Sequence, residues 1–238
     1  MEQDLTLFDE SASSFAAWVD RLIAMRRYRR GECFIHAAQS VVPAEGYILD
    51  YGCGPGRISA LLAGRGFRVL GVDPSAAMIE AARQQPRGSL SMRFETASTP
   101  PLGNEHCGFD AIVCSSVIEY EVNPDELLQR FFAALRPTGT LIISFANSQS
   151  VWRRLFQKRN MMLGAQRHTW TWTAFRDLLL RNGFESNREA VYYETAFDRF
   201  PLLRFLAGSR FVGPLGLAVA TKDASFHGAI SAPPTVQN

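Results

Sequence analysis

Short apolar runs alternate with amphipathic segments along most of the chain, and glycine, proline or polar turns separate them. The apolar runs predict buried strands, and apolar positions three and four residues apart predict helices. Strands are expected at 46–50, 67–72, 90–95, 109–114 and 139–145. Helices are expected at 57–65, 75–84 and 124–135. Regular alternation of this kind indicates an α/β fold, with parallel strands and helices on both faces of one doubly wound sheet.

The segments on either side of this region complete the predicted domain. Apolar residues at helical spacing predict a helix over 11–40, which ends before Pro43. A later helix, 173–181, is closed by Asn182-Gly183, and strands follow at 184–193 and 211–221. The predicted parts are an N-terminal helical cap (1–45), one main domain (46–222) with insertions at about 147–172 and 194–209, and a flexible tail (223–238).

Composition narrows the function classes. The 238 residues carry a net charge of +2 and are 47% hydrophobic, so we expect a globular domain without extensive nucleic-acid binding. The four cysteines show neither metal-ligand spacing nor a disulfide framework, which fits a reducing cytoplasm. No signal-peptide pattern opens the chain. The apolar run 211–221 is far shorter than the ~20 residues that span a bilayer.

A glycine turn is the most informative motif. The first predicted strand ends in Asp50 and leads into Gly52, Gly54 and Gly56, and the second strand ends in the lone carboxylate Asp73. Glycines allow close approach of a ligand to the backbone, and the following helix N-terminus offers free N–H groups. A carboxylate at the position of Asp73 accepts hydrogen bonds from ribose hydroxyls. The motif therefore predicts binding of an adenosine-containing ligand.

Two features separate the possible nucleotides. A dinucleotide fingerprint requires its third glycine at position 57, where this chain has Arg57. The carboxylate of Asp50 beside the turn would repel a pyrophosphate and favour a cationic amino-acid group. Both features suit S-adenosylmethionine (SAM), which carries a sulfonium and an α-ammonium and no phosphate.

Four motifs in order resemble those of the class I SAM-dependent methyltransferases, over about Tyr47 to Thr221. They are Asp50-Tyr-Gly-Cys-Gly-Pro-Gly56, Gly71-Val-Asp-Pro-Ser-Ala-Ala-Met78, Phe109-Asp-Ala-Ile-Val-Cys114 and Leu135-Arg-Pro-Thr-Gly-Thr-Leu-Ile-Ile143. The resemblance implies a Rossmann-like, mostly parallel seven-stranded sheet. It also implies SAM as the cofactor, with no metal required.

The resemblance also assigns residues to parts of the cofactor. The turn residues Asp50, Gly52, Gly54 and Gly56 would hold the amino-acid end, and Cys53 and Pro74 also belong to the cofactor-binding segments. Asp73 would hold the ribose, Met78 would lie against the adenine, and Ser115 beside the methyl donor. The family usually has an acidic residue facing the adenine amine, and this chain has Thr96 there. The Thr96 hydroxyl is expected to accept from the amine, and the Ala97 N–H to face a ring nitrogen.

Catalytic candidates follow the fourth strand and precede a late helix. Ser115-Ser-Val-Ile-Glu-Tyr120 is similar to the small-molecule branch that includes ubiquinone-pathway O-methyltransferases, with Glu119-Tyr120 where that branch has Glu-His. His168 enters a segment that faces the acceptor in many relatives, and an imidazole suits proton abstraction near neutral pH. Structural packing remains an alternative for all three residues, Glu119, Tyr120 and His168.

The expected reaction is methylation of a small organic acceptor, most readily at oxygen. Arginines near the first helix and in 151–159 fit an anionic acceptor, an anionic membrane surface or a solvated helix face. The apolar insertion 197–206 fits a lid over a lipophilic acceptor, a peripheral membrane contact, a core element or a dimer contact. Methylation of RNA or protein and a non-catalytic binding scaffold are the alternative functions. The oligomeric state is left open.

Overall fold

The computed structural model describes most of the chain between residues 29 and 223 and a few positions outside that range. The described residues are 9, 14, 16–17, 19–21, 29–85, 91–100, 108–156, 166–186, 190–193, 211, 213–223 and 225–226. The predicted insertion 194–209, including its apolar part 197–206, lies outside these residues, as does nearly all of the tail. Among the described helices, none is both long and apolar enough to cross a lipid bilayer.

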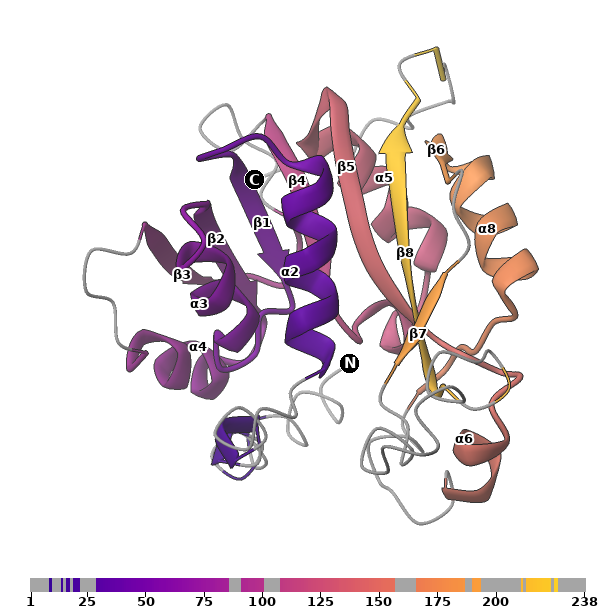
Figure 1. Cartoon of the computed structure of the whole chain (residues 1–238), viewed down its shortest axis with the longest axis horizontal. Helices are drawn as coiled ribbons and strands as arrows, with labels where there is room; N and C mark the ends of the chain where they lie inside the picture. Colours follow the sequence, from indigo (N-terminus) through magenta and orange to yellow (C-terminus); the bar gives the residue numbers. More distant parts are fainter. Residues whose placement is uncertain are drawn as a thin grey trace, which may run out of the picture.

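One mixed sheet forms the centre of the molecule, as predicted (Figure 1). Its parallel strands are β1 (Tyr47–Tyr51), β2 (Arg68–Asp73), β3 (Met92–Thr96), β4 (Phe109–Cys114) and β5 (Leu135–Ala146). Antiparallel to β5 runs β8 (Leu215–Lys222), which also pairs with β6 (Phe184–Glu185) and β7 (Val191–Tyr193). The order is β3-β2-β1-β4-β5-β8-β6, and the predicted strand 184–193 is present as the two short strands β6 and β7. Counted as one strand, they complete the seven-stranded sheet.

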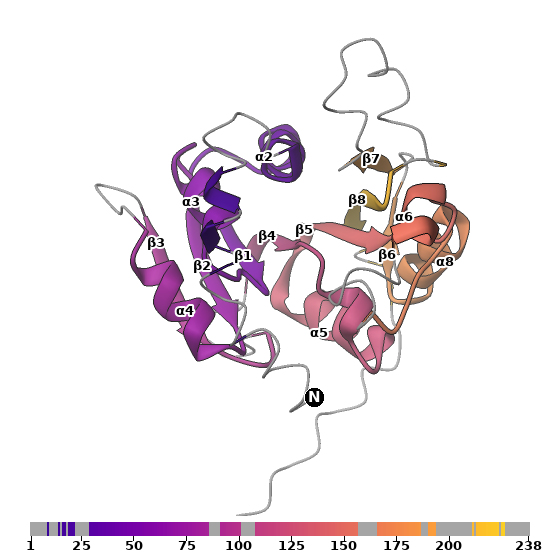
Figure 2. The same cartoon turned by 90° about the horizontal axis from the view of Figure 1, so that it is seen from below.

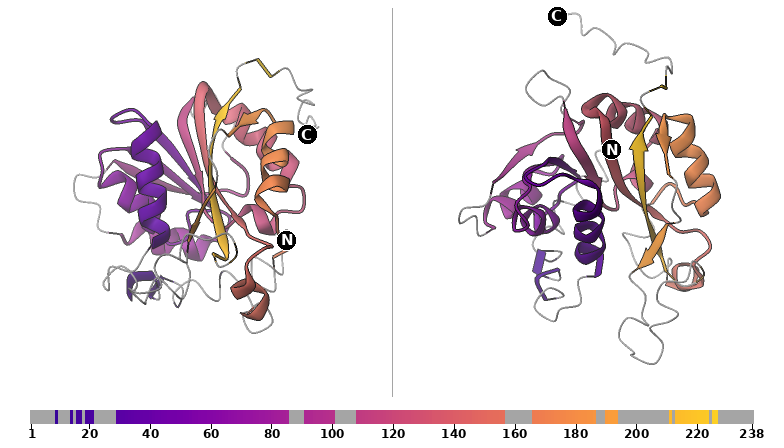
Figure 3. Two further views of the ribbon diagram at one scale, coloured as in Figure 1. Left: turned by 45° about the vertical axis from the view of Figure 1, so that its right-hand side comes forward. Right: turned by 45° about the horizontal axis from the view of Figure 1, so that its top comes forward.

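Side chains along each central strand alternate between two cores. In β4, Ala111 and Val113 face one core, whereas Ile112 and Cys114 face the other. The first core is covered by α2 (Arg29–Val41), α3 (Arg57–Ala63) and α4 (Ala76–Arg83). The second is covered by α5 (Pro124–Ala134) and α8 (Trp172–Arg181). Figures 2 and 3 show α2 and α3 on the side of the sheet opposite α5, and α8 beside β6 and β8.

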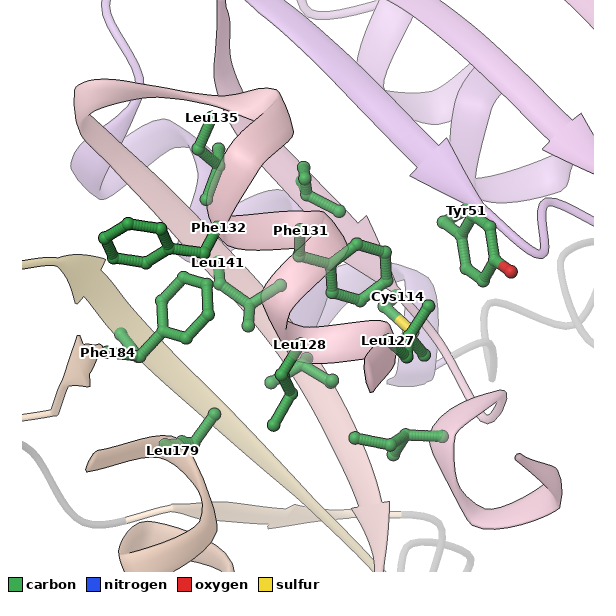
Figure 4. Close-up of a cluster of buried hydrophobic side chains, with 14 of the residues drawn as sticks. Tyr51, Cys114, Leu127, Leu128, Phe131, Phe132, Leu135, Leu141, Leu179 and Phe184 are labelled. Atoms are coloured by element: carbon green, nitrogen blue, oxygen red, sulfur yellow. The ribbon is translucent and has the colours of Figure 1, made fainter. Parts of the chain in front are cut away.

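The second core is rich in aromatic side chains (Figure 4). The ring of Phe131 on α5 meets Tyr51 of β1 edge to face, with centroids 5.2 Å apart, and Phe132 meets Phe184 of β6 at 5.7 Å. Such pairs add to the burial of apolar area that holds a helix on a sheet. They fix α5, and therefore the β4–α5 connection, relative to β1.

Local signals in the sequence define where the helices begin. Ser75 caps α4 by accepting a hydrogen bond from Met78 N at 3.1 Å, and Asn123 caps α5 by accepting one from Glu126 N at 3.3 Å. Gly183 follows α8 with φ 82°, a left-handed conformation that favours glycine. The predicted boundaries of α3, α4, α5 and α8 are confirmed to within two residues. The predicted helix 11–40 is described as α2 from Arg29 onward, and residues 22–28 lie outside the described part of the chain.

The N-terminal helical region is part of the helical layer on the sheet. Helix α2 packs on α3, β5, β7 and β8, and the buried Val19 from the preceding segment joins the same core. The strand β5 begins at Leu135 rather than at the predicted residue 139, because the Arg136–Gly139 turn is a bulge opposite β4. This difference lies at the start of β5 and leaves the carboxyl edge of the parallel strands unchanged.

Candidate active site

The glycine turn leaves β1 and is fixed to the end of β2. The N–H groups of Gly52 and Cys53 both donate to the carbonyl of Val72, at 2.8 and 3.0 Å. Gly52 has φ 69°, and a Cβ at that position would lie 2.2 Å from Cγ2 of Val117, which follows β4. The turn therefore lies between the carboxyl ends of β2 and β4, where doubly wound sheets bind ligands.

Asp73 ends β2 beside this turn. Its Oδ2 accepts the Gly54 N–H at 2.9 Å, and its Oδ1 accepts the Ser75 N–H at 2.9 Å. The side chain is largely buried, which raises the pKa of Asp73, whereas the two backbone N–H groups lower it. Each carboxylate oxygen has more than one acceptor position. The carboxylate can therefore hold the glycine turn and still accept hydrogen bonds from a ligand.

Asp50 lies behind the turn, with 1% of its surface exposed. Its Oδ2 accepts the hydroxyl of Ser59 on α3 at 2.5 Å. Burial raises the pKa of Asp50 to about 7, the Ser59 hydrogen bond opposes that rise, and the nearby Asp73 adds to it. Asp50 is thus a buried carboxyl group behind the turn rather than an exposed ligand-binding oxygen, and its contact with the amino-acid end stays a prediction.

The other turn residues have distinct positions. Cys53 is buried, and this burial raises the pKa of its thiol, so the side chain is an apolar packing element. Met78 is buried on α4, and its Sδ lies 4.0 Å from the place that a Cβ on Gly54 would occupy. Pro74 is exposed at the end of β2. Gly54, Met78 and Asp73 therefore border the same space in front of the turn.

The two residues expected at the adenine lie at the end of β3. The Ala97 N–H, which was expected to face the adenine, donates to the carbonyl of Asp73 at 3.1 Å. This bond continues the pairing of β2 with β3, since Thr96 is the register partner of Asp73. Thr96 is exposed, so its hydroxyl is accessible. A contact of either residue with an adenine stays a prediction.

Two serines follow β4 at the same edge. Among the described residues, the hydroxyl oxygens of Ser115 and Ser116 are buried and have no hydrogen-bond partner. Ser116 has φ 57°, and its N–H donates to the Ser144 hydroxyl on β5 at 2.8 Å. Strained backbone and orphaned hydroxyls are both features of binding sites. Ser115 lies at the carboxyl end of β4, and its place beside the methyl donor stays a prediction.

The structure brings the catalytic candidates into one region. Glu119 and Tyr120 lie in the short 3-10 helix η1 (Ile118–Tyr120), and Glu119 is fully buried. The carbonyl of Glu119 accepts the N–H groups of Arg167 and His168, at 2.8 and 3.0 Å. The segment before α8 is therefore bonded to the connection that follows β4, although the two are far apart in sequence.

Gln166 joins these segments through its side chain and was missed by the sequence analysis. Its Nε2 donates to Glu119 Oε1 and to the phenol oxygen of Tyr120, each at 3.3 Å. Its Oε1 accepts a hydrogen bond from Nη2 of Arg153, which lies on α6 (Val151–Phe156). Arg153 was predicted only as one member of a basic cluster, yet it is 2% exposed. Its neighbour Arg154 is exposed.

The environments of Tyr120 and His168 differ. Burial raises the pKa of Tyr120 to about 12, and Glu119 adds to the rise, so the phenol is a poor base near neutral pH. The His168 ring is partly exposed and stacks on Trp170, with centroids 5.4 Å apart and an interplanar angle of 22°. The raised pKa argues against Tyr120 as the base, and a role of His168 in proton transfer stays a prediction.

Comparison with known proteins finds similarity to methyltransferases. A family model described as a methyltransferase domain matches residues 25–189. The chain is 31% identical to a putative methyltransferase of Bacillus subtilis over 138 residues (56% of this chain, 55% of the relative). It is 32% identical to a trans-aconitate 2-methyltransferase of Paracidovorax citrulli (47% and 43%), and 33% identical to a ubiquinone biosynthesis O-methyltransferase of Glaesserella parasuis (42% and 45%).

Solved structures show the same fold. The chain is similar, with a TM-score of 0.70 and 18% identity, to a chain in the complex between the Haloferax volcanii Trm112 methyltransferase activator and a putative methyltransferase (91% of this chain, 97% of that chain). It is also similar, with a TM-score of 0.57 and 20% identity, to the magnesium protoporphyrin IX methyltransferase of Synechocystis with bound S-adenosylhomocysteine (SAH) (93% and 86%). The chain spans about half the length of the curated relatives that it matches. The matched family and the strand order together show that the chain belongs to the class I SAM-dependent methyltransferases.

Proposed function

We propose that this chain binds SAM at the carboxyl ends of β1 and β2 and transfers its methyl group to a small organic acceptor, with oxygen as the accepting atom. The observation that carries the proposal is the Asp73 carboxylate, which receives the N–H of Gly54 at 2.9 Å. This bond fixes a ribose-binding carboxylate to a glycine turn in the arrangement that nucleoside-binding sheets use.

A donor without phosphate fits these residues. Asp50 and Asp73 lie close enough for one to raise the pKa of the other, so a pyrophosphate would be repelled and a cationic amino-acid end attracted. A Cβ added to Gly54 would have only Met78 Sδ near it among the described atoms, at 4.0 Å, so the backbone is open to close approach. The residues that would hold SAM are Asp50, Gly52, Cys53, Gly54, Gly56, Asp73, Pro74, Met78, Thr96, Ala97 and Ser115.

SAM, when bound, supplies an electrophilic methyl group on its sulfonium. The protein then needs only to position the acceptor in line, exclude water and, for a phenol or alcohol, remove a proton. Good alignment alone can contribute roughly 7–11 kcal/mol to the lowering of the barrier. We assign positioning or proton removal to Glu119 and His168, since the main chain of His168 is bonded to Glu119 at 3.0 Å.

The relatives support an acceptor of small size. The trans-aconitate and ubiquinone-pathway methyltransferases are both named for small organic molecules, and the second is named as an O-methyltransferase. The curated matches cover less than half of these two relatives, so the acceptor of this chain must be found by experiment.

The test is a search for methylated products. Purified protein is incubated with SAM and a metabolite extract, and mass spectrometry compares the products with those of the Asp73→Ala variant. We expect a small molecule that gains one methyl group with the wild-type protein alone. Methylation only of added RNA or protein would contradict the proposed acceptor class. Binding of SAM without any methylated product would contradict the proposed activity and favour a binding scaffold.

A further inference from the structure

Arg153 is a buried cation with unused hydrogen-bond donors. Its side chain is 2% exposed, and its Nη2 donates to Gln166 Oε1. Among the described residues, neither its Nε nor its Nη1 has a hydrogen-bond partner, and both atoms are buried. Buried guanidinium groups are normally satisfied on every side, because an unsatisfied charged donor costs stability. This arginine therefore needs an explanation beyond packing.

The segment that carries Arg153 is held rigidly at the end of β5. Arg153 N donates to the Ser150 hydroxyl at 3.2 Å, which caps α6. The side chain of Asn147 donates to the Gly213 carbonyl at 2.7 Å and accepts the Gln149 N–H at 3.0 Å. Trp170 N donates to the Ala146 carbonyl at 2.9 Å. A side chain supported in this way is pre-organised, as a ligand-binding group requires.

The surroundings of Arg153 are those of the proposed acceptor region. Gln166 connects its guanidinium to Glu119 and Tyr120, the candidates that follow β4. Burial lowers the pKa of Arg153, while Glu119 and Tyr120 oppose this, and a guanidinium remains charged in proteins. The positive charge of Arg30 on α2 also lowers the pKa of Tyr120. Arg153 is therefore a charged group within the region that holds the catalytic candidates.

We propose that Arg153 binds a carboxylate of the methyl acceptor through its Nε and Nη1 groups. This proposal rests on the methyl-transfer function proposed above. A planar guanidinium matches a carboxylate in geometry and charge. The nearby Glu119 carboxylate, which acts on Arg153, disfavours the dianion of a phosphate monoester. Arg153 thus selects acceptors that carry a carboxylate, whichever oxygen receives the methyl group.

The test compares acids with their uncharged amides. Benzoate, 4-hydroxybenzoate and phenylacetate, with the matching primary amides, are titrated into the protein with and without SAH. Binding is read by ligand-observed NMR. We expect at least one acid to bind. Its amide should bind about tenfold or more weakly, because the amide lacks one charge-assisted hydrogen bond to the guanidinium. Equal binding of acids and amides, absence of binding by every acid, or preferential binding of inorganic phosphate would overturn the proposal.

Arg153→Gln is compared with Arg154→Gln, which removes the same charge from the exposed neighbour on the same helix. We expect Arg153→Gln to lose about tenfold or more of the acid affinity and Arg154→Gln to change it by less than about twofold. Equal losses in the two variants would contradict the assignment, and Arg153→Lys replaces Arg153→Gln if the latter does not fold. The affinity for SAH separates the proposed SAM site from the proposed role of Arg153. If the wild-type protein does not bind SAH, the SAM site is refuted, whereas the acid–amide comparison without SAH still tests Arg153.

Discussion

Replacing Gly54 by alanine tests two properties of the glycine turn separately: its contribution to folding stability and its contact with the ligand. Gly54 has φ 52°, and a Cβ there would lie 4.0 Å from Met78 Sδ, an ordinary contact. The matched control is Gly66→Ala, on the loop after α3, where φ is 91° and a Cβ meets no described atom within 4 Å. Both variants place alanine in a left-handed conformation, which costs roughly 1–2 kcal/mol.

The two variants should therefore lose similar stability and differ in ligand binding. A loss of that size lowers the melting temperature by roughly 2–4 °C per kcal/mol in a chain of this length. If Gly54 faces the nucleoside, one added methyl group in the binding space weakens SAH binding by about tenfold or more, as an extra methylene does in a packed pocket. Gly66→Ala should leave the affinity for SAH unchanged.

Thermal unfolding and isothermal titration with SAH measure the two quantities. Equal SAH affinity in the two variants would refute the reasoning, because it would place Gly54 away from the ligand. A much larger stability loss in Gly54→Ala than in Gly66→Ala would show that the turn is closed by packing and not open to a ligand.

Four further substitutions test the roles of single side chains. Tyr120→Phe should keep turnover within about threefold and the same pH profile, because a phenol with a pKa of about 12 is not a base near neutral pH; a hundredfold loss would refute this. His168→Ala and Glu119→Gln should each lower kcat by about 10²-fold or more if they move the proton, and unchanged turnover in both would refute the assignment. Asp50 has a folded pKa of about 7 against an ordinary 3.8, so it binds its proton more tightly when folded. Its contribution is therefore present below pH 3.8 and is lost as the pH rises to 7. Asp50→Asn should abolish that part of the pH dependence in denaturant titrations, and an unchanged slope would contradict it.

Local sequence signals were sufficient for the elements that form the cofactor side. The caps Ser75 and Asn123, the apolar strands and the carboxylate at the end of β2 depend on neighbours within a few residues. The glycine turn was predicted for the same reason, since glycine is the residue that allows the positive φ found at Gly52 and Gly54.

The acceptor side depends on contacts between distant segments and was predicted only in part. Nothing near Arg153 in the sequence distinguishes it from Arg154, yet one is buried and the other exposed. Its partner Gln166 is thirteen residues away, and the Gln166–Glu119 bond spans 47 residues. The bond from the Ala97 N–H to the Asp73 carbonyl likewise depends on the pairing of two strands. Such contacts arise from the topology of the sheet, which no short pattern encodes.

Calorimetric titration of the wild-type protein and its Asp73→Ala variant with SAM and SAH tests the central claim most directly. We predict saturable binding of both compounds by the wild-type protein. With unchanged circular dichroism, the variant should bind about tenfold or more weakly, because the ribose loses its charged acceptor and Gly54 its hydrogen-bond partner. Absence of binding by the wild-type protein, or equal affinity in the variant, would contradict the account.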